Sequence, residues 1–214
     1  MLQIHGRATS SNVQAVMWAA SEMAIDHVRT DVGGPFGGNR TPAFLAKNPM
    51  GRVPVIEDGD ITLFESQAIL RYLATRHADP AFWPTSLGAR AVVDQWMEWS
   101  KVNVAPVVIY KVFWQLIRTS AAERDHNRVA EGVAELDALM TIADAQIARQ
   151  GWLAGPHMTL ADISFGTLLY RYFTVPFARK DLAALADYYA RLVTRPAYAE
   201  HVMVSFEEMR VPGA

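Results

Sequence analysis

Gly51-Arg52-Val53-Pro54-Val55-Ile56 is the stretch that decides the fold of this chain, and Glu65-Ser66-Gln67-Ala68-Ile69 follows it nine residues later. A proline cannot donate a hydrogen bond to a sheet ladder. Within the apolar, strand-like run Val-Pro-Val-Ile, Pro54 must therefore open the strand at an edge, a bulge or a cis turn. The backbone of Val53 is then free to pair with a ligand.

The residues after this stretch predict a turn, a second strand and the start of a helix. Asp58-Gly59-Asp60 is typical of a tight turn, and residues 61–64 (Ile-Thr-Leu-Phe) of a short strand. A helix is expected from Ser66 onward. The first N–H groups of a helix lack internal partners and attract anions. The open strand and the helix start together predict a site that holds an extended peptide with a carboxylate.

This arrangement resembles the glutathione-binding site of the glutathione S-transferase family, and the resemblance covers residues 3–209. In that family, a valine before a cis-proline pairs its backbone with the cysteinyl backbone of glutathione. The resemblance assigns this role to Val53 and Pro54. Among members, the chain is most similar to bacterial transferases with a Ser-Ser-Asn-Val start and a Gly-Gly-Pro-Phe-Gly-Gly loop, here residues 10–13 and 33–38.

Charge matching extends the resemblance to both ends of glutathione. Glu65 can meet the γ-glutamyl ammonium group, and Ser66 with the helix start can meet the γ-glutamyl carboxylate. Asn39, Arg40 and Arg52 lie where the family holds the glycyl carboxylate. A planar guanidinium suits that task by its geometry. Glutathione is thus the expected co-substrate.

Composition excludes several other kinds of chemistry. The chain has 214 residues, 51% of them hydrophobic, which suffices for one large or two small domains. The formal net charge of −2 gives no reason to expect nucleic acid or an anionic membrane as a partner. Cysteine is absent, so any sulfur chemistry must use the sulfur of a ligand. The six histidines show no close metal-binding spacing, and no metal is expected.

The N-terminus shows no signal pattern, and no apolar run approaches the length of a membrane span. We therefore expect a cytoplasmic protein.

The chain is expected to have an α+β fold, with a thioredoxin-like N-terminal domain followed by an all-α helical bundle. Val13, Val16, Met17 and Ala20 recur at helical spacing, which predicts a helix with one side on a sheet. The predicted order in the first half is strand 2–5, helix 13–24, strand 27–32, helix 41–47, two strands and a helix. The predicted domains are residues 1–78 and 88–214, joined by a proline-containing linker at 79–87.

Helices alone are predicted beyond the linker. A long helix over residues 88–118 contains Pro106, which should kink or break it. Thr159-Leu160-Ala161-Asp162 is a variant capping box, which predicts that a helix begins there. In the family the matching segment is a core folding element, so the resemblance implies a structural role for Asp162. The further predicted helices are 123–150, 188–192 and 196–209. The basic residues of this half that we interpret as solvated surface charges are Lys101, Arg118, Arg124 and Arg128.

The expected catalytic residues are Ser10 and Asn12. A thiol of pKa about 8.5 is mostly protonated at neutral pH, so a transferase must favour the thiolate. One hydrogen bond to a charged acceptor contributes roughly 1.5–3 kcal/mol, enough to lower a thiol pKa by one to two units. By resemblance, Ser10 matches the serine or threonine of the serine-type classes and Asn12 the asparagine of some bacterial relatives. The alternative is that Ser10, Ser11 or Asn12 only caps the following helix.

A second, apolar pocket for the electrophile is expected beside the kinked helix, with Tyr110, Phe113 and Trp114 as its lining. Aromatic residues at this spacing are also common in cores and dimer contacts, which is the alternative reading.

The resemblance implies a glutathione transferase that ionises the thiol and conjugates it to small hydrophobic electrophiles in detoxification. It also implies a homodimer, in which the helix at residues 67–76 meets the long helices of a partner. Two alternatives remain open: a glutathione-dependent disulfide-bond reductase, and a non-catalytic glutathione-binding module. An isomerase is disfavoured because Asn12 replaces the cysteine typical of those relatives.

Overall fold

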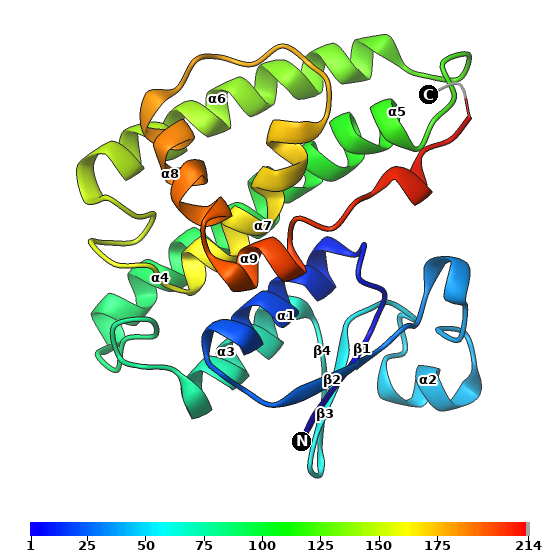
Figure 1. The fold of residues 1–214 in the computed structure, drawn as a ribbon, viewed down its shortest axis with the longest axis vertical. Coiled ribbons are helices and arrows are strands. Elements are labelled where there is room, and N and C mark those ends of the chain that lie inside the picture. Colours follow the sequence, from blue (N-terminus) through cyan, green and yellow to red (C-terminus); the bar gives the residue numbers. More distant parts are fainter. Residues whose placement is uncertain (213–214) are drawn as a thin grey trace.

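Four short strands form a mixed sheet at the N-terminal end of the molecule (Figure 1). In the computed structural model, which describes residues 1–212, the strand order is β2-β1-β3-β4. Strand β1 (Leu2–His5) pairs in parallel with β2 (His27–Thr30) and antiparallel with β3 (Val55–Asp58). A tight turn at Gly59 then returns the chain into β4 (Ile61–Phe64), which pairs antiparallel with β3. The predicted strands are confirmed, although β2 is shorter than expected.

The helices of this half complete a thioredoxin-like unit. They are α1 (Ser11–Glu22), α2 (Pro42–Lys47) and α3 (Ser66–His77). The order β-α-β followed by α-β-β-α is the predicted one, and it confirms the fold class. Beyond β4 the described residues contain no strand. Helix α3 ends at His77 and the next helix begins at Leu87, which are the two ends of the segment that contains the predicted linker at 79–87. The predicted second domain extends to residue 214, and its last two residues, 213–214, lie outside the described residues.

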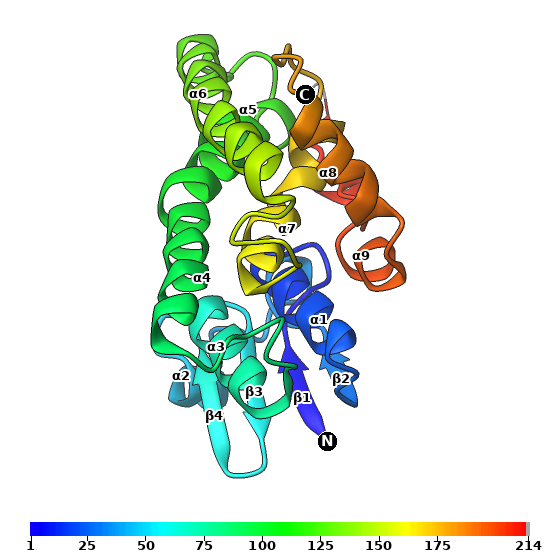
Figure 2. The same ribbon diagram turned by 90° about the vertical axis from the view of Figure 1, so that its left-hand side faces the viewer.

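The second half is helical throughout (Figures 1 and 2). Its α-helices are α4 (Leu87–Trp99), α5 (Trp114–Ile117), α6 (His126–Gln150), α7 (Leu160–Thr174), α8 (Ala183–Val193) and α9 (Pro196–His201).

Pro106 widens the long helix rather than breaking it. Between α4 and α5 the chain stays helical through two π-helical segments, η2 (Ser100–Val104) and η3 (Val107–Phe113). Proline lacks an N–H group and its ring displaces the carbonyl one turn back, and a π turn absorbs both defects without a break. The extent of the helix predicted at 88–118 is therefore confirmed. The distortion expected at Pro106 takes the form of wider, π-helical turns.

The predicted helix over residues 196–209 is wrong in its second half. Helix α9 ends at His201, and only a short 3₁₀ turn, η4 (Glu207–Met209), follows. The cause lies in packing, because buried Phe206 inserts its ring 5.1 Å from the ring of Phe113. An irregular segment brings Phe206 to that position.

Helix α1 is buried on two opposite sides. Val13, Val16, Met17 and Ala20 pack with the sheet, as predicted. Trp18, with its neighbours on the other side of the helix, belongs to the core of the helical half instead. Figure 2 shows α1 between the sheet and α7. The sequence pattern indicated only the first of these two faces.

The capping box at the start of α7 is present. The Thr159 side chain accepts a hydrogen bond within the first turn of α7, and the Asp162 carboxylate accepts one from the Thr159 backbone. Asp162 is fully buried and also accepts hydrogen bonds from Leu153 N and from the Tyr188 hydroxyl. This network lies inside the helical core, which agrees with the structural role predicted for Asp162.

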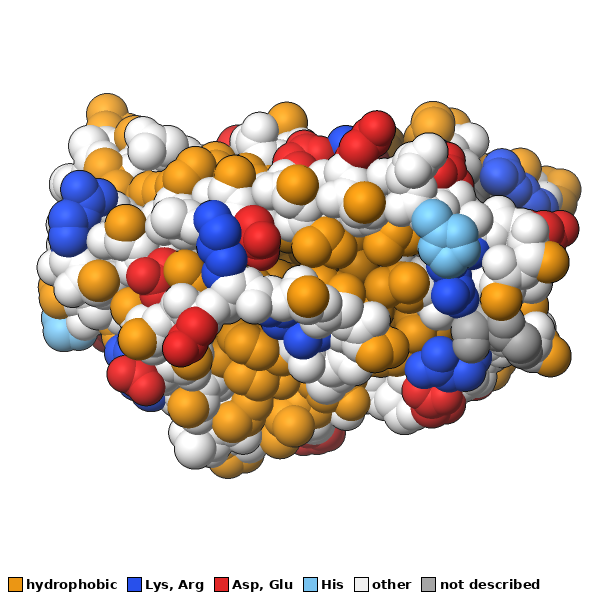
Figure 3. Space-filling model, turned by 90° about the horizontal axis from the view of Figure 1, so that it is seen from above, with side chains coloured by type: hydrophobic (Ala, Val, Ile, Leu, Met, Phe, Trp, Pro, Cys, Tyr) orange, Lys and Arg blue, Asp and Glu red, His pale blue; other side chains and the backbone are white. Residues whose placement is uncertain are grey.

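The outer face of the helical half carries interspersed acidic and basic side chains, with apolar side chains gathered in a hollow at its middle (Figure 3). Within residues 1–212, no helix combines the length and the apolar character that crossing a membrane requires.

Candidate functional site

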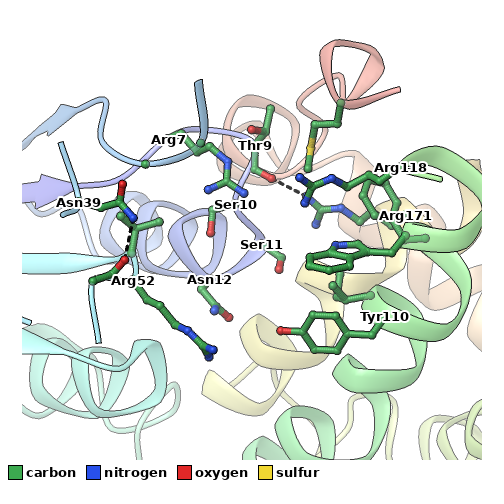
Figure 4. Close-up of a pocket in the computed structure, with 18 residues that line it drawn as sticks. Arg7, Thr9, Ser10, Ser11, Asn12, Asn39, Arg52, Tyr110, Arg118 and Arg171 are labelled. Atoms are coloured by element: carbon green, nitrogen blue, oxygen red, sulfur yellow. Dashed lines mark hydrogen bonds between the residues drawn. The ribbon is translucent and has the colours of Figure 1, made fainter. Parts of the chain in front are cut away.

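A cleft between the two halves of the molecule contains the predicted site residues. It consists of two adjoining cavities of about 460 and 270 Å³, which share the first turn of α1, Arg52, Val53 and the side of η3 that carries Tyr110. Every predicted site residue except Arg40 lines one cavity or the other, and Figure 4 shows the larger of the two. The lining residues are Ser10, Asn12, Asn39, Arg52, Val53, Pro54, Glu65, Ser66, Tyr110, Phe113 and Trp114. Exposed Arg40 instead donates a hydrogen bond to the Met50 carbonyl at 3.4 Å.

The Ser10 hydroxyl is free of the capping role that was the alternative. Ser10 occupies the N-cap position of α1, but within the described residues its side chain makes no capping hydrogen bond. The hydroxyl group lies in the wall of the larger cavity. Because it is not used by the helix, it remains available as a donor to a bound group.

Lys101 is a site residue that the sequence analysis assigned wrongly to the surface. Its Nζ donates a hydrogen bond of 2.7 Å to Asn12 Oδ1 and lies 3.5 Å from Ser66 Oγ. The amide oxygen of Asn12 is thus occupied, and its NH₂ group is left as the donor. Helical spacing could not reveal this, because the π turn η2 sets the direction of Lys101.

Partial burial disfavours the charged form of Lys101. Burial lowers the pKa of Lys101, although the carboxylates of Glu65 and Glu98 oppose the shift. A bound anion would favour the charged form of such a desolvated amine, so this position suits an anionic ligand.

The Val53–Pro54 peptide bond is cis, and β3 begins immediately after it at Val55. Val53 lines both cavities. Two asparagine side chains hold this segment: Asn48 Nδ2 donates to the Arg52 carbonyl at 2.8 Å, and Asn39 Nδ2 donates to the Gly51 carbonyl at 2.8 Å. One N–H of Asn39 is therefore already used, which leaves the exposed Arg52 as the stronger cation for a carboxylate.

Glu65 has a backbone conformation that is unusual for a residue with a side chain. It precedes α3 with φ of 70° and ψ of 111°, and it lines the smaller cavity. Such a conformation costs about 1–3 kcal/mol and is concentrated at functional sites. The strain places an exposed carboxylate beside Ser66 and the free N–H groups of the helix start.

Of the three aromatic residues predicted to line the electrophile pocket, one lies in the core and two are accessible. Phe113 is buried, whereas Tyr110 and Trp114 are 45% and 42% exposed. The rings of Tyr110 and Trp114 meet edge to face at 5.1 Å. Large rings exposed on a cavity wall are suited to cover an apolar ligand.

Three arginines of the larger cavity escaped the sequence analysis or were assigned to the surface. Arg7 follows β1, Arg118 follows α5 and Arg171 lies in α7. Arg118 is exposed, as predicted, and it also stacks on Trp114 at 4.8 Å and lines the cavity. The one available sequence signal was an arginine within the otherwise apolar run around Arg171.

Comparisons with known proteins agree on one family. Residues 9–76 match the family model of the glutathione S-transferase N-terminal domain, and residues 112–191 match that of the C-terminal domain. The chain is 32% identical to glutathione S-transferase GstB of Escherichia coli K12, over 95% of this chain and 99% of the relative. It is 31% identical to glutathione S-transferase 4 of Zea mays, over 92% of this chain and 89% of the relative.

A solved structure extends this agreement to the fold. The theta class glutathione S-transferase from Xanthomonas axonopodis pv. citri, with glutathione bound, matches with a TM-score of 0.90. Its sequence is 43% identical over 95% of this chain and 98% of that chain.

The positive φ of Glu65 predicts that glycine at this position stabilises the fold. Glu65→Gly should raise the free energy of unfolding by about 1 kcal/mol, because glycine adopts positive φ without a steric cost. Glu65→Ala is the matched control, since it also removes the carboxylate but keeps the Cβ atom. Urea denaturation followed by tryptophan fluorescence measures both. Equal stability of the two variants would contradict the strain.

Proposed function

Because the chain belongs to the glutathione S-transferase family, we propose that it ionises the thiol of glutathione and conjugates the sulfur to small electrophiles. It is a glutathione transferase with glutathione as its co-substrate. The observation that carries the proposal is a pair of donors at the start of α1 that no other residue of 1–212 uses, the NH₂ group of Asn12 and the hydroxyl of Ser10. Conjugation to an apolar electrophile, detoxification and a cytoplasmic location belong to the proposal as well.

The donor set suits an extended tripeptide with two carboxylates. Lys101, Ser66 and the start of α3 surround one end of the cleft and would hold the γ-glutamyl carboxylate. Glu65 would meet the ammonium group of the same residue. Arg52 would meet the glycyl carboxylate, which leaves the backbone of Val53 for the cysteinyl unit between the two ends.

Thiolate formation would follow from the two donors that line the same cavity, the Ser10 hydroxyl and the Asn12 amide. Each hydrogen bond to the anion contributes roughly 1.5–3 kcal/mol, and the N-terminal dipole of α1 adds about 0.3–1 kcal/mol. Lys101 acts on Asn12 rather than on the sulfur. By occupying Asn12 Oδ1 it fixes which end of the amide faces the cleft.

The co-substrate supplies the nucleophilic sulfur, and the chain supplies orientation and anion stabilisation. Tyr110 and Trp114 would cover the electrophile on the opposite wall and exclude water from it. The disulfide-bond reductase remains an alternative prediction. Turnover of a model disulfide compared with that of 1-chloro-2,4-dinitrobenzene separates the two reactions.

Removal of both proposed donors tests the thiolate site. The Ser10→Ala, Asn12→Ala double variant should lose the thiolate absorbance of bound glutathione at neutral pH and at least about tenfold in kcat for 1-chloro-2,4-dinitrobenzene. Absorbance near 240 nm, titrated against pH, reports the thiol pKa in the complex. Undiminished absorbance and turnover would refute the assigned roles.

Lys101 should strengthen glutathione binding and at the same time lower the stability of the folded chain. Lys101→Met should raise KM for glutathione roughly tenfold, because the variant loses a charged donor for the γ-glutamyl carboxylate. The folded protein disfavours the charged lysine, since its pKa is lowered. Stability should therefore rise in the variant below that pKa, and the gain should shrink as pH increases through it.

Exposed Lys180, which lies outside the cleft lining, provides the control Lys180→Met. Unchanged KM in Lys101→Met would exclude the proposed contact.

We also propose a homodimer in which α3 and α4 form the contact. The two helices are joined by an ion pair between Arg71 and Asp94 at 2.6 Å. Apolar side chains are exposed along α4 and η2, with Val102 63% exposed. Light scattering should give about twice the chain mass of 23.8 kDa, and Val102→Asp should shift the protein toward the monomer. A mass of one chain for the unaltered protein would rule the dimer out.

A further inference from the structure

Three arginines gather on one side of the larger cavity with no acidic partner. Arg7, Arg118 and Arg171 lie along this side in Figure 4, whereas Arg52 lies opposite. Among residues 1–212, none of the three forms an ion pair with a carboxylate. The side chains of Arg7 and Arg118 donate no hydrogen bond within the same residues. We refer to Arg7, Arg118 and Arg171 as the arginine cluster.

Arg171 is the buried member of the cluster. It is 3% exposed, and it uses two of its five N–H groups: Nη1 donates to Gln14 Oε1 at 3.2 Å and Nη2 to the Thr9 carbonyl at 2.8 Å. Its Nε and the neighbouring hydroxyl of Thr9 are buried without a hydrogen-bond partner among the described residues. Both partners of Arg171 are neutral, so its charge is uncompensated.

The members of the cluster repel one another. Burial, and then the charge of Arg7, lowers the pKa of Arg171 to about 10, so that it stays charged at neutral pH. Burial and the charge of Arg118 lower the pKa of Arg7, against the smaller opposing effect of exposed Glu208. A buried cation without a counter-charge costs several kcal/mol, and cores rarely retain one without a reason.

We propose that the arginine cluster is a carboxylate-binding subsite in the electrophile half of the cleft, which adds small acidic electrophiles to the substrates of the enzyme. The proposal rests on the proposed transferase function and names a substrate class for it. Arg118 and Arg7 supply accessible guanidinium groups, which bind a carboxylate through two parallel hydrogen bonds. Arg171 supplies a fixed charge behind them. Trp114, on which Arg118 stacks, places an aromatic surface beside the bound anion.

Position separates this subsite from the glutathione groove. Val53, Arg52 and Asn39 lie on the β3 side of the cavity, and the residues assigned to the γ-glutamyl end line the smaller cavity. Arg118 and Arg171 instead adjoin Trp114 and Phe113, at 4.8 and 5.1 Å from the respective rings, while Arg7 lies beside Gly34 at the boundary with the Val53 side. A carboxylate held there belongs to the second substrate and not to glutathione.

Two aryl chlorides of nearly equal shape test the proposal: 4-chloro-3-nitrobenzoate, which is anionic, and 4-chloro-3-nitrobenzamide, which is neutral. In both reactions the glutathione sulfur forms a bond to the ring carbon and the C–Cl bond breaks. Chloride leaves with the bonding electron pair, and the thiol proton passes to solvent. Only the group opposite the reacting carbon differs, and its effect on the intrinsic reactivity of the ring is the same for every variant, so the change in the ratio of the two kcat/KM values between enzyme and variant isolates recognition of the charge.

Arg118→Gln should lower kcat/KM for the benzoate roughly tenfold, through KM for the benzoate, while the amide changes less than about twofold. Arg7→Gln should act in the same direction. The control is Arg128→Gln, which removes the same charge from an exposed position on α6 and should leave the ratio unchanged. An equal loss for both aryl chlorides, a rise in KM for glutathione alone, or no loss would each overturn the subsite.

A binding measurement with unreactive probes tests the subsite independently of catalysis. Unreactive 3-nitrobenzoate should bind the unaltered enzyme at least about tenfold more tightly than 3-nitrobenzamide, and Arg118→Gln should remove that preference, as calorimetry can detect. Failure of the transferase function would show as absent glutathione binding and absent turnover of 1-chloro-2,4-dinitrobenzene. Equal affinity for the two unreactive probes would overturn the subsite whether or not the enzyme is active.

Discussion

The site depends on the burial of α1 on two faces. One face of the helix packs on the sheet through Val16, and the opposite face carries Trp18 into the core of the helical half. A helix held on both sides cannot tilt or slide without opening one core, so its first turn is fixed at the junction of the two halves. Ser10 and Asn12 therefore face the cleft on a rigid element, which is what a catalytic donor requires.

The same junction accumulates polar groups that stability alone would not select. Arg171 extends from α7 to the Thr9 carbonyl, and Lys101 extends from η2 to Asn12, so both halves of the molecule meet at the start of α1 through buried or partly buried cations. Glu65 adds backbone strain on the third side of the cleft. Each of these features is unfavourable in the folded chain by itself, and a bound anion would offset the cost of the two cations. Unfavourable groups gathered in one cleft are typical of a binding site, and the packing of the surrounding hydrophobic cores provides the stability that offsets them.

Local signals in the sequence predicted the fold and one wall of the cleft. Pro54 within a strand-like run and the Glu65-Ser66 helix start are short-range patterns, and both were placed correctly beside the cleft. Lys101 was assigned to the surface because charges on a helix are usually solvated, and its position in the cleft depends on how the two halves pack. Arg118 is exposed, as assigned, but it also lines the larger cavity. Arg171 contacts residues 157 and 162 positions earlier in the chain. No local sequence pattern contains such a contact, so only the tertiary structure could show that Arg7, Arg52, Arg118 and Arg171 form a cationic wall of the larger cavity.

The cationic wall and thiolate formation are coupled through their common cavity. Arg7, Arg52, Arg118 and Arg171 all line the space in which the proposed thiolate would form, and Lys101 lies behind Asn12 at its edge. Positive charges near a titrating thiol lower its pKa, and they are screened little where water is excluded. The net charge of −2 for the whole chain therefore conceals a strongly positive interior surface. An acidic electrophile bound to the arginine cluster would neutralise part of this field at the moment of attack. The donors on α1, which we propose contact the sulfur directly, would then carry a larger share of the thiolate stabilisation, so short-range hydrogen bonds would still be needed in a cleft with an excess of positive charge.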